Sequence, residues 1–184
     1  MRLKDEALKK KFVAGSRKAF TIVYDRYCDA MYNICLRYTR NTDEAADMLQ
    51  DAFIKIHEKC NSFNPEYELG GWIKRIVINT AINHIRQNKR IDLVEDFNTM
   101  DGGENELENF EIVSDKNLKS ELIDILNSLP EGYRTVFNLF VFDNLTHKEI
   151  AGYLDVTENT SKSQLFKAKK MISKLLIEKN LIKR

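Results

Sequence analysis

The stretch 92–115, near the middle of the chain, contains nine acidic side chains and no basic one. Its apolar residues follow neither a helical nor a strand period, and it includes the pair Gly102-Gly103. Such a segment repels itself and buries too little apolar surface to fold alone. It therefore predicts a flexible linker, and it divides the 184-residue chain into two small domains, 1–91 and 116–184, that must each build a core of their own.

The linker also hides the charge of the two flanking domains. The formal net charge of the whole chain is +1, which taken alone argues against a nucleic-acid binder, because such proteins usually carry a basic surface. Residues 1–91 carry a net charge of +6 and residues 116–184 a net charge of +4, against −9 for the linker. Two mildly basic domains are compatible with a polyanionic partner.

Apolar residues recur at helical spacing on both sides of the linker, and the chain has only two prolines and seven glycines. This composition disfavours a β-sandwich or barrel, and no segment shows the alternation of a half-buried strand. We therefore predict an all-α fold of two helical domains. The expected helices span residues 16–40, 42–60, 70–89, 116–128, 131–142, 146–154 and 158–177.

Capping residues and apolar stripes specify how these helices should lie. Ser16 can cap the start of the first helix, and Asn41 can end it. Spacing alone assigns the buried stripe of the second helix to Ala46, Leu49, Phe53 and Ile56, and that of the helix after the linker to Leu118, Leu122, Ile125 and Leu126.

The last two predicted helices form a helix-turn-helix. Thr146 is an N-cap with Glu149 three residues on, the spacing of a capping box, and residues 155–157 make the turn. Polar and cationic residues occupy the first two turns of the second of these helices, which suits a DNA major groove. The alternative is an ordinary helical hairpin with a solvated lysine face.

The first domain has two polar faces. Asp47, Gln50 and Asp51 lie opposite the predicted buried stripe, where they form either a solvated face or a dock for a basic partner. The next helix carries polar residues that can reach phosphates and base edges: Arg75, Asn79, Asn83 and Arg86. The loop 61–69 before it holds Phe63 and Tyr67, which can stack on unpaired bases or close the helix packing, and packing is favoured for Phe63.

Taken together and in this order, three motifs resemble those of the ECF (extracytoplasmic-function) group of bacterial RNA polymerase sigma factors. The segment 44–56 resembles the polymerase-binding helix of the group, and the segment 71–86 resembles its −10-binding helix. The segment 129–163 resembles its −35-binding domain. The resemblance covers almost the entire chain.

This resemblance implies a cytoplasmic initiation factor that binds core RNA polymerase, recognises the −35 and −10 elements of promoter DNA, and stabilises the melted −10 strand. The loop 61–69 would receive a flipped base. The polymerase contacts would be Asp47, Gln50 and Asp51, the −10 contacts Arg75, Asn79, Asn83 and Arg86, and the −35 contacts Thr160, Lys162, Ser163, Phe166 and Lys167. The free protein would bind promoters weakly, and the holoenzyme well.

Several departures from the pattern of the group concern DNA recognition. Asn83 stands where many members carry Asp, and Lys162 and Lys167 stand where Arg is frequent. Lysine is expected to read guanine more weakly than arginine does. Asn159 and Ser161 also stand where Gly and Val are frequent, so the promoter sequence does not follow from the resemblance.

Other function classes fit less well. A helix-turn-helix regulator that is not a polymerase subunit explains the second domain but not the two motifs of the first. An enzyme is disfavoured because His57, His84 and His147 lack partner residues, and no cofactor or metal site is expected: Cys28, Cys35 and Cys60 lack metal-type spacing. The chain has no apolar run long enough for membrane insertion.

Two questions about partners stay open in the sequence. Members of the group are commonly held by an anti-sigma factor that clamps the two domains, but no residue identifies one here. The acidic linker is either a solvated tether or a shield that covers the DNA-binding faces until polymerase displaces it.

Overall fold

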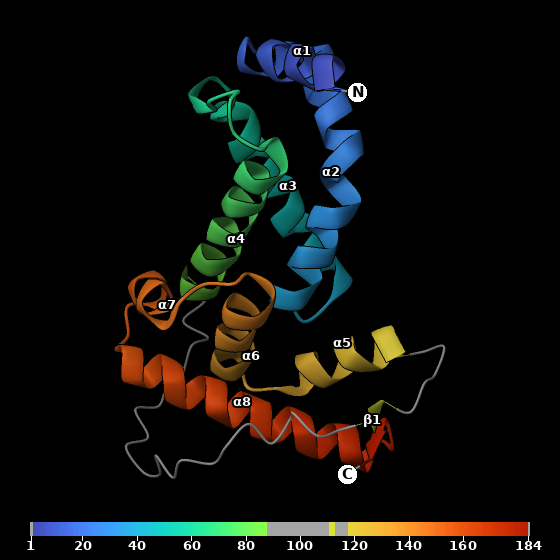
Figure 1. Ribbon diagram of the computed structural model, residues 1–184, viewed down its shortest axis with the longest axis vertical. Helices are drawn as coiled ribbons and strands as arrows, with labels where there is room; N and C mark the ends of the chain where they lie inside the picture. Colours follow the sequence, from blue (N-terminus) through green and yellow to red (C-terminus); the bar gives the residue numbers. More distant parts are fainter. Residues whose placement is uncertain (1, 88–110, 113–117, 184) are drawn as a thin grey trace. The chain divides into compact units, whose positions relative to one another are not determined.

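The computed structural model describes residues 2–87, 111–112 and 118–183. These residues are predominantly helical, as predicted, and the chain separates into two compact units, Met1–Ile85 and Arg86–Arg184 (Figure 1). The predicted linker lies outside the described residues except at Glu111–Ile112.

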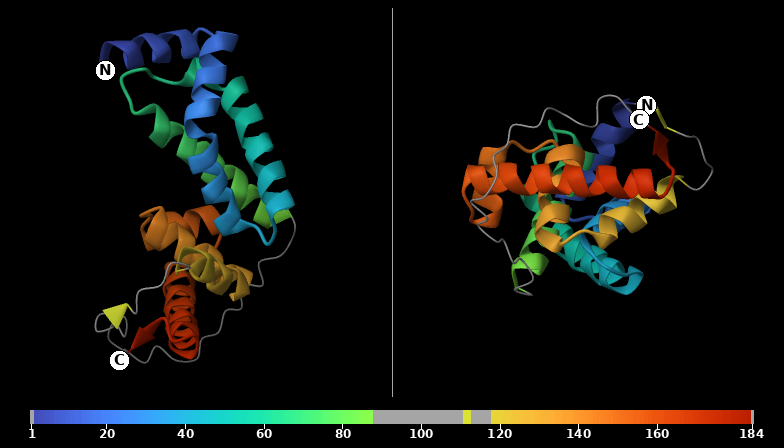
Figure 2. Two further views of the ribbon diagram at one scale, coloured as in Figure 1. Left: turned by 90° about the vertical axis from the view of Figure 1, so that its right-hand side faces the viewer. Right: turned by 90° about the horizontal axis from the view of Figure 1, so that it is seen from below.

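The first unit is built from four α-helices. They are α1 (Arg2–Val13), α2 (Arg17–Tyr38), α3 (Thr42–Glu58) and α4 (Leu69–Gln87), with a 3₁₀ turn at Cys60–Ser62. Helices α2, α3 and α4 run side by side, and α1 lies across one end of them (Figures 1 and 2). The apolar periodicity did not predict α1, although Asp5 and Glu6 stand four residues before Lys9 and Lys10, a spacing that favours a helix.

An aromatic cluster closes the end of this unit where α1 lies. The ring of Phe12, only 1% exposed, contacts those of Phe20, Phe63 and Trp72 at centroid distances of 6.4, 6.4 and 6.1 Å. Aromatic pairs of this kind contribute about 0.5–1.5 kcal/mol each beyond the burial of their area. Phe12 therefore ties α1 to α2, to the loop before α4 and to α4 itself.

The helix ends of this unit confirm one predicted cap and correct another. Ser16 is the N-cap of α2, and its hydroxyl accepts a hydrogen bond from the backbone N–H of Ala19. Asn41 does not end α2, which stops at Tyr38. Its side chain instead caps α3 by accepting from Glu44 N at 2.8 Å. Asparagine satisfies an orphan N–H at a helix start as well as it ends a helix, so sequence alone did not distinguish the two roles.

The buried face of α3 is rotated by one residue from the predicted stripe. Phe53 and Ile56 are buried as expected, but Ala46 is exposed and Leu49 is only partly buried. The core side of the helix is made instead by Ala45, Met48 and Ala52. The small side chains of Ala45 and Ala52 allow close packing between α3 and α2. Because alanines stand at both 45 and 46, the apolar spacing is compatible with two positions of the buried stripe.

The described residues of the second unit form four more α-helices, of which α8 is the longest. They are α5 (Leu118–Ser128), α6 (Glu131–Phe137), α7 (His147–Leu154) and α8 (Glu158–Glu178), with a π-helical turn, η2, at Asn138–Phe142. Helices α5, α6 and α7 all pack against α8. Two short strands, β1 (Glu111–Ile112) and β2 (Ile182–Lys183), pair antiparallel, a feature too short for an alternation pattern to predict.

The core of this unit joins α5, α8 and the residues after α8. Ile125 and Leu126 are buried as predicted, but Leu122 is 36% exposed and is not part of the core. The buried cluster consists of Ile125, Leu126, Leu129, Ile172, Leu176, Leu181 and Ile182, with Phe137, Met171 and Leu175 packed against it.

A polar layer lies beside that core. Arg134 of α6 is 2% exposed and donates through Nη1 to Asn127 Oδ1 at 3.1 Å, and Gln164 and Ser161 of α8 are buried as well. Buried polar groups are costly unless they are hydrogen-bonded, so this layer requires a defined geometry between its helices.

The corner between α1 and α2 gives a direct test of the fold. Gly15 has φ +74°, where a Cβ costs about 1–2 kcal/mol. We expect Gly15→Ala to destabilise the first unit by that amount, measured by urea unfolding followed through Trp72, the only tryptophan of the chain.

Gly71→Ala is the matched control, because Gly71 lies in α4 with open space at its Cβ position. It should leave stability unchanged or raise it by up to about 1 kcal/mol. Equal effects of the two substitutions would contradict a conformational requirement at Gly15.

Candidate functional site

The acidic face of α3 is fully open to solvent. Asp47, Gln50 and Asp51 are all exposed, on the side of the helix away from Met48 and Ala52. Ile54, one turn further on, is 49% exposed. A single exposed isoleucine is ordinary on a protein surface, so a docking role depends on the apolar surface around it.

An apolar groove runs beside these residues, between α2 and α3. Its volume is about 630 Å³, and it is lined by Phe20, Tyr24, Tyr32, Ala46, Leu49, Gln50, Phe53, Ile54, His57 and Glu58. Ala46 and Leu49, which spacing assigned to the core, are thus surface residues of this groove. The rotation of α3 places an apolar floor next to an acidic rim.

A polar stripe follows one side of α4. Arg75, Asn83 and Arg86 are exposed and Asn79 is partly buried, while Ile73, Val77 and Ile85 fill the opposite, buried side. The predicted −10 residues are therefore brought together on a single helix face. Guanidinium and amide groups so placed can contact phosphates and base edges.

The loop that precedes α4 presents one of its two aromatic rings. Phe63 is 2% exposed and packs on Phe12 and Trp72, as favoured from the sequence. Tyr67 is 69% exposed. Only the tyrosine ring of this pair is available to an incoming base.

The helix-turn-helix of the second unit is formed by α7 and α8. The predicted capping box is present: Thr146 Oγ1 accepts from Glu149 N, and the carboxylate of Glu149 accepts from Thr146 N at 2.8 Å. Asp155 ends α7 in the left-handed conformation, with φ 57°. This sharp corner lets α8 begin at Glu158, after a short turn.

The first two turns of α8 separate the predicted −35 residues into two groups. Lys162 and Phe166 are exposed, and Ser163 and Lys167 are partly exposed. Thr160 is 8% exposed and its hydroxyl lies 2.8 Å from that of Thr157, the N-cap of α8. Thr160 therefore belongs to the helix cap, and the solvent-facing surface consists of the other four residues.

Two family models match the chain over these same elements. The model described as Sigma-70 region 2 matches residues 23–91, and the model described as Sigma-70, region 4 matches residues 119–172. The ECF RNA polymerase sigma-E factor of Haemophilus influenzae is 31% identical over 179 residues, covering 92% of this chain and 94% of that protein. The chain belongs to the ECF group of RNA polymerase sigma factors. The sigma-E factor of Escherichia coli K12 is also 31% identical, over 178 residues, with coverage of 92% and 93%.

Two solved structures share the fold. CnrH, in complex with the cytosolic domain of CnrY, is 19% identical with a TM-score of 0.53, covering 95% of this chain and 97% of that one. The sigma factor RpoE from Bartonella quintana, in complex with the anti-sigma factor NepR, is 21% identical with a TM-score of 0.54, covering 86% and 97%.

Membership of the group fixes the kind of activity. Sigma factors are initiation factors that direct RNA polymerase to promoters, and they are not enzymes. In the described part of the chain, no three His, Cys, Asp or Glu side chains are grouped as they would be around a metal ion. No helix among these residues has the length and hydrophobicity of a membrane span.

One histidine of the sigma factor joins the two helices of its DNA-binding motif. His147, the first residue of α7, has Nδ1 2.9 Å from Ser161 Oγ of α8, and its ring stacks on Phe140 at 4.7 Å. Desolvation by burial, followed by the charge of Lys162, lowers the pKa of His147 from its ordinary value of 6.5. Sequence reasoning considered His147 only as a catalytic group and missed this coupling.

We expect the second unit to lose stability on acidification. Because the pKa of His147 is lowered in the fold, the unfolded chain binds the proton more readily, so the contribution of this group is complete above pH 6.5 and declines as the pH falls through 6.5. Urea unfolding followed by circular dichroism between pH 7.5 and pH 5 measures the trend. His147→Gln should flatten that part of the pH dependence; an unchanged slope would assign it to other groups.

Proposed function

We propose that this sigma factor contacts the −35 element through the start of α8 and holds the melted −10 strand with α4 and the loop 61–68. The observation that carries the proposal is the stripe of Arg75, Asn79, Asn83 and Arg86, which lies on the solvent side of α4, next to a loop with an exposed tyrosine. Phosphate contacts position a strand, and amides and aromatic rings engage its bases.

For the −35 element, we propose contacts by Lys162, Ser163, Phe166 and Lys167. Ammonium groups bind phosphates or guanine, and an exposed phenylalanine suits a thymine methyl group. Thr160 supports these contacts from the helix cap.

The proposed core-polymerase site is the acidic face of α3 together with the groove beside it. Gln50 lines the groove together with Leu49 and Ile54, and Asp47 and Asp51 are exposed next to these residues on α3. A basic, amphipathic helical surface is the partner that fits both parts, and the clamp helices of the largest polymerase subunit are the candidate that the family implies.

The proposed domain organisation follows from these roles. Residues 1–91 bind polymerase and the −10 element, residues 116–184 bind the −35 element, and the acidic residues 92–115 connect them as a tether. Two weak DNA contacts joined by one tether reinforce each other when the distance between the −35 and −10 elements matches the length of the tether. We place this activity in the cytoplasm, with an anti-sigma factor, as bound by RpoE from Bartonella quintana, as a candidate regulator.

The mechanism we propose makes no covalent bond. Opening the −10 element costs a few kcal/mol for each base that leaves the stack, and capture of the base by the protein offsets that cost. The open state then becomes more populated because the holoenzyme binds it better than the duplex.

The decisive experiment is in vitro transcription with core RNA polymerase and this protein over a genomic promoter library. Transcripts that start at a common set of sites only when the protein is present support the proposal. A helix-turn-helix regulator that is not a polymerase subunit would instead bind DNA tightly without polymerase, and it would not direct core polymerase to initiate transcription.

Charge reversal on α3 tests the polymerase site. We expect Asp47→Lys combined with Asp51→Lys to weaken binding to core polymerase by roughly tenfold or more, since like charges at an interface are repulsive. Asp25→Lys is the matched control, an exposed acid of α2 that does not line the groove. Binding by fluorescence anisotropy should distinguish them, and an equal loss in both variants would refute a local site.

Charge removal on α8 tests the −35 surface. Lys162→Ala should weaken promoter binding by the holoenzyme and lower the slope of log affinity against log salt by about one. Lys174→Ala removes the same charge further along α8, where the side chain is 75% exposed and pairs with Glu178 at 3.7 Å. If promoter binding by the Lys162→Ala variant kept the salt dependence of the wild type, the DNA would not contact this part of α8.

A further inference from the structure

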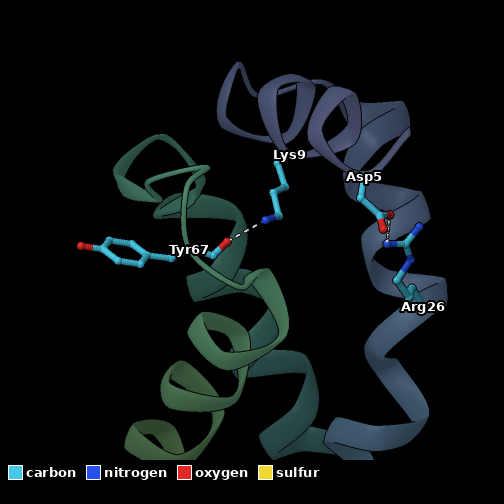
Figure 3. A network of polar contacts seen from close by, with 4 residues as sticks. All are labelled: Asp5, Lys9, Arg26 and Tyr67. Atoms are coloured by element: carbon cyan, nitrogen blue, oxygen red, sulfur yellow. Dashed lines mark hydrogen bonds and ion pairs between the residues drawn. The ribbon is translucent and has the colours of Figure 1, made fainter. Parts of the chain in front are cut away.

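Helix α1 is joined by a hydrogen bond to the loop that precedes α4. Lys9 Nζ donates to the backbone oxygen of Tyr67 at 2.8 Å, across 58 positions of sequence (Figure 3). Loop carbonyls at the surface usually bond to water, whereas this one is held by the ammonium group of a partly buried lysine. The bond fixes the backbone of the loop at the position of its exposed aromatic residue.

Two further contacts hold α1 in place for this role. Phe12 packs on Phe63 of the same loop and on Trp72 at the start of α4. Asp5 Oδ1 and Arg26 Nη1 of α2 form an ion pair at 2.8 Å, also drawn in Figure 3. The helix is thus anchored to α2 at both ends, through Arg26 and Phe20, and to the loop and α4 at the end that carries Phe12.

This arrangement determines where the Tyr67 ring lies. With its carbonyl held toward α1, the side chain points away from α1 and from Lys9 (Figure 3). Its 69% exposure leaves a ring face open. A ring that already projects into solvent meets a base without a prior rearrangement of the loop, which reduces the ordering cost of binding.

We propose that α1 is part of the −10 site, and that Lys9 is a positioning residue that holds Tyr67 ready to stack on an unpaired base. This inference rests on the proposed function of the loop and extends it to a helix that precedes residues 23–91, the segment matched by Sigma-70 region 2.

The surroundings of Lys9 favour a base over a phosphate as the ligand of this part of the site. A hollow of about 290 Å³ beside Lys9 is lined by the carboxylates of Asp5, Glu6, Glu66 and Glu68 and by two cations, Lys9 itself and Arg26, which is paired with Asp5. The lining is net negative, which disfavours a phosphate, and the ammonium of Lys9 already has the Tyr67 oxygen as its partner. Stacking on the tyrosine ring needs no charge and accepts any base.

The test uses holoenzyme on a promoter found in the transcription library, with 2-aminopurine placed in turn at each −10 position of the non-template strand. Its fluorescence reports unstacking of the base from the DNA and quenching by an aromatic ring. The variants are Lys9→Met, which keeps the aliphatic stem without a donor, Lys9→Arg, which keeps a donor, and Tyr67→Leu. Lys10→Met is the matched control, the same charge loss on the exposed neighbour.

We expect Lys9→Met and Tyr67→Leu to weaken open-complex formation by about fivefold to a hundredfold, as the loss of one charged hydrogen bond or one stacked base implies. Both should abolish quenching at one and the same −10 position. Lys9→Arg and Lys10→Met should behave like the wild type. Emission of Trp72 in the free protein and binding of a −35 duplex should not change in any variant.

Two results would overturn the inference. One is wild-type quenching and open-complex formation in Lys9→Met. The other is an equal loss of −10 and −35 binding together with a shifted Trp72 emission, which would assign Lys9 to general stability. Failure of the proposed function itself is a separate result, because then the wild-type protein would give no promoter-dependent transcript.

Discussion

Each half of this chain must close a hydrophobic core of its own, and that constraint shapes the rest of the molecule. The inner faces of the helices supply these cores: Val23, Ile56, Ile73 and Val77 in the first unit, and Ile125, Leu139 and Ile150 in the second, are almost completely buried. Side chains on the outer faces of these helices are not needed in the cores and are available to partners. The polar stripe of α4 and the cationic start of α8 are the outer faces of helices whose inner faces hold a unit together.

The sequence predicted the helices well where apolar spacing was unambiguous, and the outer face of α4 followed from it directly. It failed where one residue can serve two roles. Ala45 and Ala46 allow two registers of α3, and packing against α2 selected the one that leaves Ala46 and Leu49 in a groove. Asn41 suits the end of one helix and the start of the next. Spacing also did not indicate that Thr160 is only 8% exposed, with its hydroxyl 2.8 Å from that of the N-cap Thr157; its predicted contact with DNA stays a prediction. These choices depend on contacts made across the fold, which spacing does not encode.

Acidic and basic side chains lie on different helix surfaces of this protein. The overall +1 conceals an acidic, apolar surface on α3 and cationic surfaces on α4 and α8. Because α3 and α4 of one small unit carry opposite signs, the proposed polymerase and −10 sites use separate groups, and a protein surface and a nucleic acid would not compete for them. Hydrogen-bonded contacts such as His147–Ser161 then fix how the cationic surface is presented, because they join the scaffold helix to the helix that bears the lysines.

The aromatic cluster around Phe12 also has a consequence for the order of folding. Sixty residues of chain separate Phe12 from Trp72, whereas the short connection between α2 and α3 makes their contacts local. Local contacts form faster than those that close a long loop, so the α2–α3 hairpin precedes the cluster. During synthesis, α1 leaves the ribosome before the residues around Trp72. It can pack on α2 at once, but the surface that it covers is complete only after α4 has been made.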